Sequence, residues 1–85
     1  MAVVRPYEDG NSEPNSLHVH TYRAPSDSNR LLCNVTWDVL ASTSWEVRPI
    51  EDRAEVPSHE VAMERAQKFA HERSIPIIFE QNDAA

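Results

Sequence analysis

The chain has 85 residues, 14 acidic against 8 basic side chains, a net charge of −6 and a single cysteine. A chain of this length forms one small domain. The single cysteine excludes an internal disulfide and any zinc site built from several cysteines. Binding to a nucleic-acid backbone needs clustered positive charge, but the arginines are scattered along this acidic chain, so we expect no nucleic-acid partner.

The sequence contains no segment typical of membrane insertion or export. No apolar run approaches the roughly 18 residues of a transmembrane helix, and the first residues lack the long apolar core of a signal peptide. We therefore expect a cytoplasmic protein with no membrane contact. Plentiful alanine and arginine, with a single lysine, are typical of a bacterial protein from a GC-rich genome.

Residues 1–16 differ in composition from the rest of the chain. The stretch from Pro6 to Ser16 is polar and contains two prolines and the only glycine, Gly10. Such a composition is typical of loops and flexible segments. Residues 2–5 are consistent with either a short strand or a disordered start. We predict a flexible N-terminal segment over 1–16 and a single folded domain over 17–85.

Three strands are predicted in the first part of that domain, over Leu17–Arg23, Arg30–Leu40 and Trp45–Ile50. Each shows apolar and polar residues in alternation, which is the period of a half-buried strand. Turn-forming residues fill 24–29, and the charged residues 51–55 are predicted to connect the third strand to a helix. The odd-numbered residues of the second strand form its apolar face: Leu31, Cys33, Val35, Trp37 and Val39.

The hairpin between the second and third strands has a preferred register. Setting Val39 opposite Trp45 also sets Trp37 opposite Val47 and keeps the apolar residues on one face. A slip by one residue would place Asp38 opposite Val47 and divide that face, which is disfavoured. The preferred register requires a loop with an odd number of residues.

A helix is predicted from an N-cap at Ser58 to Arg73, because its apolar residues recur with a period of 3.6. Pro76 ends it, since the residue before a proline avoids the α-helical region. Ile77–Phe79 then forms a short strand, which lies at a sheet edge or pairs only after Pro76. A right-handed crossover would make this strand parallel to its neighbour, either the first or the third strand. The apolar stripe of the helix consists of Val61, Ala62, Ala66, Phe69 and Ala70.

The elements follow one another as strand, strand, strand, helix, strand. This order predicts an α+β fold with a small sheet of three to four strands and one helix packed on one face. The second half of the chain resembles small bacterial domains of unknown function that end in a strand, a helix and a strand. The resemblance transfers no catalytic residue. It rests on Trp45-x-Val47, Ser58, the alanines at 62, 66 and 70, and Ile77-Ile78-Phe79.

One face of the predicted sheet has no helix to cover it, so a function would have to use that open face. Alternate positions, counted from the buried residues, give its members: His18, His20, Tyr22, Asn34, Thr36, Asp38, Glu46, Arg48, Ile78 and Glu80. The candidate binding residues that we select from this set are His18, His20, Tyr22, Asp38, Glu46 and Arg48.

We expect a non-catalytic protein-interaction or accessory module with no cofactor, which binds another protein or its own copy through the open face or a strand edge. The chain has no nucleophile elbow, phosphate-binding loop or dinucleotide motif, so we do not expect an enzyme. Cys33 is expected in the core as a small apolar residue. The alternative is a metal or small-ligand site centred on His18 and His20, which point the same way about 7 Å apart on a strand. Asp38 or Glu46 would then supply an oxygen ligand.

Overall fold

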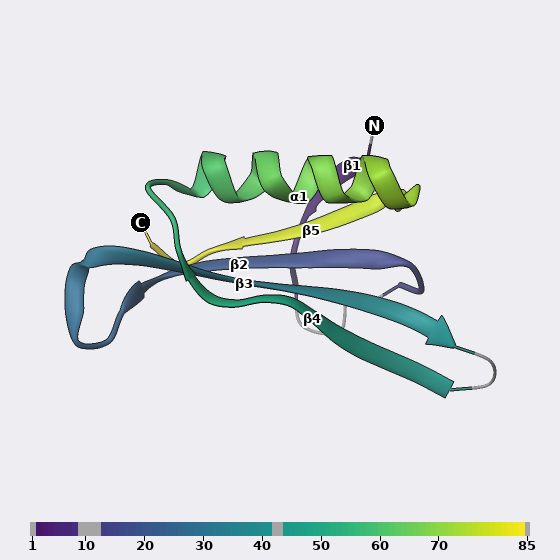
Figure 1. Ribbon diagram of the computed structural model, residues 1–85, viewed down its shortest axis with the longest axis horizontal. Helices are drawn as coiled ribbons and strands as arrows, with labels where there is room; N and C mark the ends of the chain where they lie inside the picture. Colours follow the sequence, from purple (N-terminus) through teal and green to yellow (C-terminus); the bar gives the residue numbers. More distant parts are fainter. Residues whose placement is uncertain (1, 9–12, 42–43, 85) are drawn as a thin grey trace.

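The computed structural model describes residues 2–8, 13–41 and 44–84, with the backbone alone at residues 40, 41 and 45. The described residues form a five-stranded sheet with a single helix on one face (Figure 1). The elements are β1 (Val3–Pro6), β2 (Ser16–Ala24), β3 (Asp27–Ala41), β4 (Ser44–Glu55), α1 (His59–Arg73) and β5 (Ile77–Asn82).

The strands lie in the order β1-β5-β2-β3-β4. Strand β5 is parallel to both β1 and β2, whereas β2, β3 and β4 pair antiparallel along the chain. The α+β class and the single helix on one face are therefore confirmed. The sheet has five strands instead of three to four, because β1 joins it. The last strand pairs only after Pro76, as one of the two alternatives predicted, and it is parallel to its neighbours.

Strand β1 brings part of the N-terminal segment into the sheet. It pairs with β5 from Val3 opposite Ile77 to Pro6 opposite Glu80. Just before it, Ala2 is buried in the core and its carbonyl accepts a hydrogen bond from Gln67 on the helix (3.4 Å). The strand that residues 2–5 allowed is thus present, and the sheet begins before the predicted domain boundary at residue 17. Residues 9–12 lie outside the described part of the chain.

The helix begins and ends where the sequence indicates. The Ser58 hydroxyl accepts a hydrogen bond from the amide of Val61 (3.3 Å), which is the expected N-cap. At the other end Ser74 takes the left-handed conformation (φ 57°), and the next amide, of Ile75, bonds the carbonyl of Ala70 (2.9 Å). No helix in the described part of the chain is long and apolar enough to cross a membrane.

The core lies between α1 and the sheet. The buried alanines of the helix stripe let the backbone of α1 approach β2 and β5 closely. Farther out, the rings of Trp37 and Phe69 meet edge to face at 5.7 Å, and the Arg73 guanidinium lies 5.1 Å from the Phe69 ring. The buried cluster comprises Ala2, Leu17, Val19, Cys33, Val35, Val56, Ala62, Ala66, Ala70, Ile75 and Ile78.

The predicted register of the β3–β4 hairpin is wrong by one residue. Asp38 pairs with Val47, and the strands close with Ala41 opposite Ser44, so the connection has the even length of the commonest hairpins. The apolar face is recovered farther along, because register shifts on both sides of Val35 let Ile50 pack on the core. Val47 is left 58% exposed. Residues 42–43 and the side chain of Trp45 lie outside the described part of the chain.

Two further corrections concern strand ends. Residues 51–55 were predicted as a connection but belong to β4, which continues past an irregularity at Arg53 (φ 58°). The amide of Arg53 donates to Asn34 Oδ1 (2.7 Å) instead of to a backbone carbonyl. In β5, Ile78 lies opposite Leu17 in the core and Glu80 lies opposite Val19, so neither is on the open face. The run Ile77-Ile78-Phe79 has no alternation, so its sequence could not indicate which side faces the helix.

Candidate functional site

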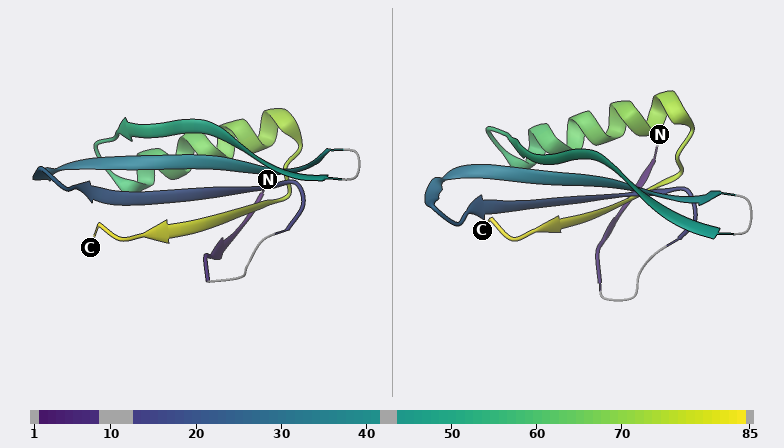
Figure 2. Two further views of the ribbon diagram at one scale, coloured as in Figure 1. Left: turned by 90° about the horizontal axis from the view of Figure 1, so that it is seen from below. Right: turned by 60° about the horizontal axis from the view of Figure 1, so that its bottom comes forward.

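A row of stacked rings lies along β2, on the sheet face opposite α1. The one helix of the described residues lies on the other side of the sheet, as the further views of the ribbon show (Figure 2). Tyr7 stacks on His18 with ring centroids 4.0 Å apart and planes 15° apart. His18 is followed by His20 at 6.3 Å and by Tyr22 at 5.1 Å from His20. The rings turn their faces toward one another, so they present mainly their edges to solvent. We call these four residues the ring row.

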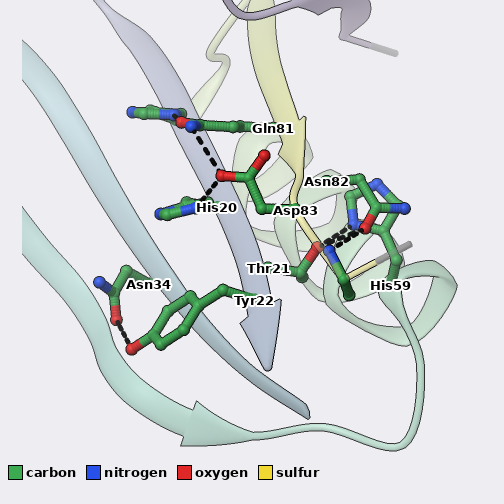
Figure 3. Close-up of polar contacts among 10 residues, drawn as sticks. His20, Thr21, Tyr22, Asn34, His59, Gln81, Asn82 and Asp83 are labelled. Carbon is green, nitrogen blue, oxygen red and sulfur yellow. Dashed lines mark hydrogen bonds and ion pairs between the residues drawn. The ribbon is translucent and has the colours of Figure 1, made fainter. Parts of the chain in front are cut away.

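Polar side chains from neighbouring strands hold the ring row in place. His18 donates from Nε2 to Gln81 Oε1 (3.0 Å), and His20 donates from Nε2 to Asp83 Oδ2 (2.8 Å). The Gln81 amide also donates to Asp83 Oδ2 (3.1 Å), next to the bond from His20 (Figure 3). The two histidine contacts therefore belong to one network. On the β3 side, the Tyr22 hydroxyl donates to Asn34 Oδ1 (3.2 Å). The row is therefore held by hydrogen bonds from both sides.

Burial makes charge unfavourable at one end of the ring row. Burial lowers the pKa of His18 below its usual value, and nearby His20 lowers it further, although the Gln81 hydrogen bond and Asp38 act in the opposite direction. Burial also raises the pKa of Asp38, while His18 acts to lower it. These pKa shifts favour the neutral forms of His18 and of Asp38, so this part of the face offers hydrogen-bonding groups more than charge.

The structure brings together four of the six predicted binding residues. His18, His20 and Tyr22 lie in the ring row, and Asp38 lies on the same face, opposite Ser16 on β2. Glu46 and Arg48 do not belong to this face. They pair with Val39 and Trp37, because of the shifted register, and so lie on the helix side of the sheet at its edge.

Sequence reasoning missed three members of this surface. Tyr7 was placed in the flexible segment, because it follows Pro6 in the polar stretch and nothing local indicates that its ring stacks on His18. Gln81 and Asp83 were missed because they reach the histidines only through the parallel pairing of β5 with β2. No local pattern in the sequence indicates that pairing.

A second histidine network lies on the helix side of the same strands. His59 Nδ1 is 2.7 Å from Thr21 Oγ1, and its Nε2 donates to Glu80 Oε2 (2.9 Å). The order hydroxyl, imidazole, carboxylate is that of a catalytic triad. The hydroxyl belongs to a residue with 0% exposure, however, so no substrate can reach it. This network instead ties the first residue of α1 to β2 and β5 (Figure 3).

Other chemical possibilities find little support in the described residues. They contain no group of three or more histidine, cysteine, aspartate or glutamate side chains arranged to hold a metal. His18 and His20 each use Nε2 in a hydrogen bond within the protein. Cys33 is fully buried, and burial together with Glu51 raises its pKa to about 11, which disfavours the reactive thiolate.

Two hollows lie away from the ring row, both next to the helix. One of about 300 Å³ is found at its C-terminal end and is lined by Ala2, Ala70, His71, Ser74, Ile75 and Pro76. Another of about 80 Å³ lies between the helix and the β3–β4 side of the sheet and is lined by Val35, Ile50, Glu51, Arg65, Ala66 and Phe69.

The chain was also compared with known proteins. No protein-family model matches it, and neither the curated proteins nor the solved structures provide a match. The resemblance of its second half to small bacterial domains of unknown function therefore stays a prediction.

Proposed function

We propose that this protein is a non-catalytic protein-interaction module whose contact surface is the open face centred on the ring row. The observation that carries the proposal is the stacked set of Tyr7, His18, His20 and Tyr22 on the side of the sheet that no helix covers. Aromatic residues are enriched in protein interfaces, where they combine a large apolar area with a polar tip.

The order already present in the ring row favours binding. Each immobilised side chain lowers affinity by its lost rotational freedom, roughly 0.5–1.5 kcal/mol for a flexible one. Here the hydrogen bonds to Gln81, Asp83 and Asn34 fix three of the four rings in the free protein. A partner would therefore meet a surface whose ordering is largely complete.

The chemistry of the surface suits a protein partner better than a nucleic acid. Sequence-tolerant nucleic-acid binding uses aromatic faces on which bases stack, together with a positively charged groove. The rings here are stacked on one another, and the chain carries a net charge of −6. Edge-on tyrosine and histidine offer donors and acceptors that suit peptide groups and polar side chains.

Site-specific photo-crosslinking in the native cells tests this proposal. A photoreactive phenylalanine analogue replaces Tyr22 in one variant and Lys68, on the exposed side of α1, in the matched control. We expect a discrete crosslinked species of fixed mass from position 22 and none from position 68. The species should fall about tenfold when His20→Ala is added, because that change removes one ring and its link to Asp83.

Two outcomes would contradict the proposal. One is the absence of any discrete species from position 22 when circular dichroism shows that the variant is folded. The other is equal crosslinking from positions 22 and 68, which would indicate unspecific contact. The mass of the species also separates a different protein from a second copy of this chain.

A further inference from the structure

From Glu46 to Glu55, strand β4 has its outer backbone side at the edge of the sheet. Among the described residues it pairs only with β3, and the strand order places it last. An edge strand is a ready template for pairing with another chain. Natural proteins protect such edges with proline, charge and irregularities, and β4 has these from Pro49 through the bulged Arg53 to Glu55. Before Pro49 the strand has neither a proline nor a positive-φ residue, and its two charged residues, Glu46 and Arg48, are of opposite sign.

The backbone N–H and C=O of Val47 point outward from this edge. Its partner on β3 is Asp38, whose carbonyl accepts a hydrogen bond from the amide of Asn15 on the β2 side (2.8 Å). The N–H and C=O of one strand residue point to the same side, so those of Asp38 point away from β4. The pair of Asp38 and Val47 is therefore the type without mutual hydrogen bonds, and Val47 keeps both groups for another strand.

We propose that two copies of this chain associate through antiparallel pairing of their β4 edges, with Val47 opposite Val47 of the second copy. A two-fold axis at this residue makes the sequence around it complementary to itself. Glu46 then lies opposite Arg48 of the second copy, and Arg48 lies opposite Glu46. Directly opposed unlike charges on adjacent strands stabilise the pairing. The two side chains already lie on one face, 3.2 Å apart, within each chain.

The same register also pairs the backbone groups and the valine side chains along this edge. The two Val47 residues exchange a reciprocal pair of N–H···O bonds, and their side chains, each 58% exposed alone, cover one another. The amide of Trp45 donates to the carbonyl of Pro49 in the second copy. Because proline has no N–H, one backbone hydrogen bond is missing at each end of the paired segment. Pairing ends at Pro49, so the interface is smaller than the roughly 1,200 Å² of stable complexes and the dimer exchanges rapidly.

This inference uses the edge of the sheet, so it is independent of the open-face surface proposed above. Sedimentation velocity of the full chain, from about 20 μM to about 1 mM, measures the association. The sedimentation coefficient of the unmodified protein should rise with concentration. Amide NMR shifts should change on dilution mainly at Glu46, Val47 and Arg48. Val47→Pro should abolish both effects, because it removes the central outward N–H and leaves the bonds to β3 intact.

A charge exchange supplies the sharper test. Arg48→Glu alone places glutamates opposite each other, and Glu46→Arg alone does the same with arginines. Each variant should associate about tenfold more weakly than the unmodified chain. An equimolar mixture of the two variants restores both opposite pairs and should recover the association. Lys68→Glu makes the same change of net charge as Arg48→Glu, but on the exposed side of α1. It should have no effect on the association.

A protein that stays monomeric throughout this concentration range would overturn the inference. So would an association that Val47→Pro and both charge variants leave unchanged, since the contact would then lie elsewhere, such as at β1. If Val47→Pro failed to fold, the mixture of charge variants would still decide, because those exposed substitutions do not touch the core. Failure here leaves the crosslinking test of the open face unaffected.

Discussion

His18 lies between the rings of Tyr7 and His20, where a positive charge would be poorly solvated. The ring keeps one hydrogen bond, to Gln81, which either protonation state can donate. The neutral form therefore fits the fold better than the charged form, as the direction of its pKa shift indicates. A histidine at this position makes the stability of the domain sensitive to mild acid.

The sign of this sensitivity follows from the lowered pKa in the fold. The unfolded chain takes up a proton at His18 at a higher pH than the folded chain, so the free energy of unfolding falls as pH drops below about 6.5. The fall due to this residue should be less than about 1 kcal/mol, because the ring is only half-buried and solvent screens its charge. Urea unfolding at pH 7.5 and pH 5 measures the change.

The matched comparison uses His18→Gln and His71→Gln, which each remove one histidine. His71 is exposed on the helix. The difference in the free energy of unfolding between pH 7.5 and pH 5 should shrink in His18→Gln. It should stay unchanged in His71→Gln. Equal behaviour of both variants would show that His18 does not carry the effect. Titration of the His18 ring protons by NMR reports its pKa directly.

Individual site residues were predictable where strand alternation determines them. His18, His20 and Tyr22 share a face because alternate residues of any strand do, whatever its neighbours. Their hydrogen-bond partners Gln81 and Asp83 come from the far end of the chain. Those contacts depend on which strands are neighbours in the sheet, and that property belongs to the whole fold.

At the level of the elements, the C-terminal end of α1 carries a strained residue. Ser74 ends the helix with φ 57° and ψ 42°, a left-handed conformation in which its Cβ is crowded. Glycine has no Cβ and is the usual residue at this position. The serine provides the required geometry at a higher conformational energy than glycine would.

Ser74→Gly should therefore raise the free energy of unfolding by about 0.5–1 kcal/mol. The control is Glu72→Gly, two residues earlier within the helix, which should lower it by a similar amount. Urea denaturation with an unchanged slope provides the measurement for both variants. A loss of stability in Ser74→Gly would mean that the serine hydroxyl contributes more than the backbone strain removes.

The hairpin shows which element features the sequence could not determine. Apolar alternation favoured Trp37 opposite Val47, yet the closing pair of Ala41 and Ser44 places Arg48 there. Pattern arguments assume an unbroken strand, whereas the shifts around Val35 let one strand change register halfway. The helix, in contrast, was predicted correctly at both ends, because the Ser58 cap and the restriction imposed by Pro76 are both local in the sequence.

For the whole molecule, the contribution of β1 to the stability of the fold can be tested directly. It covers the outer edge of β5, while the residues on either side of it reach opposite faces of the sheet. Ala2 is buried beside the helix, and Tyr7 stacks on the open face. The α+β class could be predicted from element order alone. The fifth strand was only one of two alternatives for residues 2–5, because so short an apolar stretch before a polar, proline-containing segment fits a strand and a disordered start equally well.

Deletion of residues 1–8 should lower the free energy of unfolding by about 2 kcal/mol or more, because it removes a strand ladder, a buried side chain and a stacked ring. Chemical denaturation of the truncated and full chains measures the difference. Glu8→Ala, an exposed change in the same segment, should have almost no effect. A flexible segment outside the fold would instead predict that truncation leaves stability unchanged.

The position of β5 between β1 and β2 has a consequence for how the chain acquires its structure during synthesis. Both β1 and β2 pair with β5, although each precedes it on the chain. As a ribosome extends the chain, β2, β3 and β4 can form their antiparallel ladders early, while β1 has no neighbour until β5 emerges. The residues of β1 are therefore made before the other strands of the sheet and are among the last to pair. Until then the backbone of β1 has no strand partner and is available to chaperones or to other nascent chains.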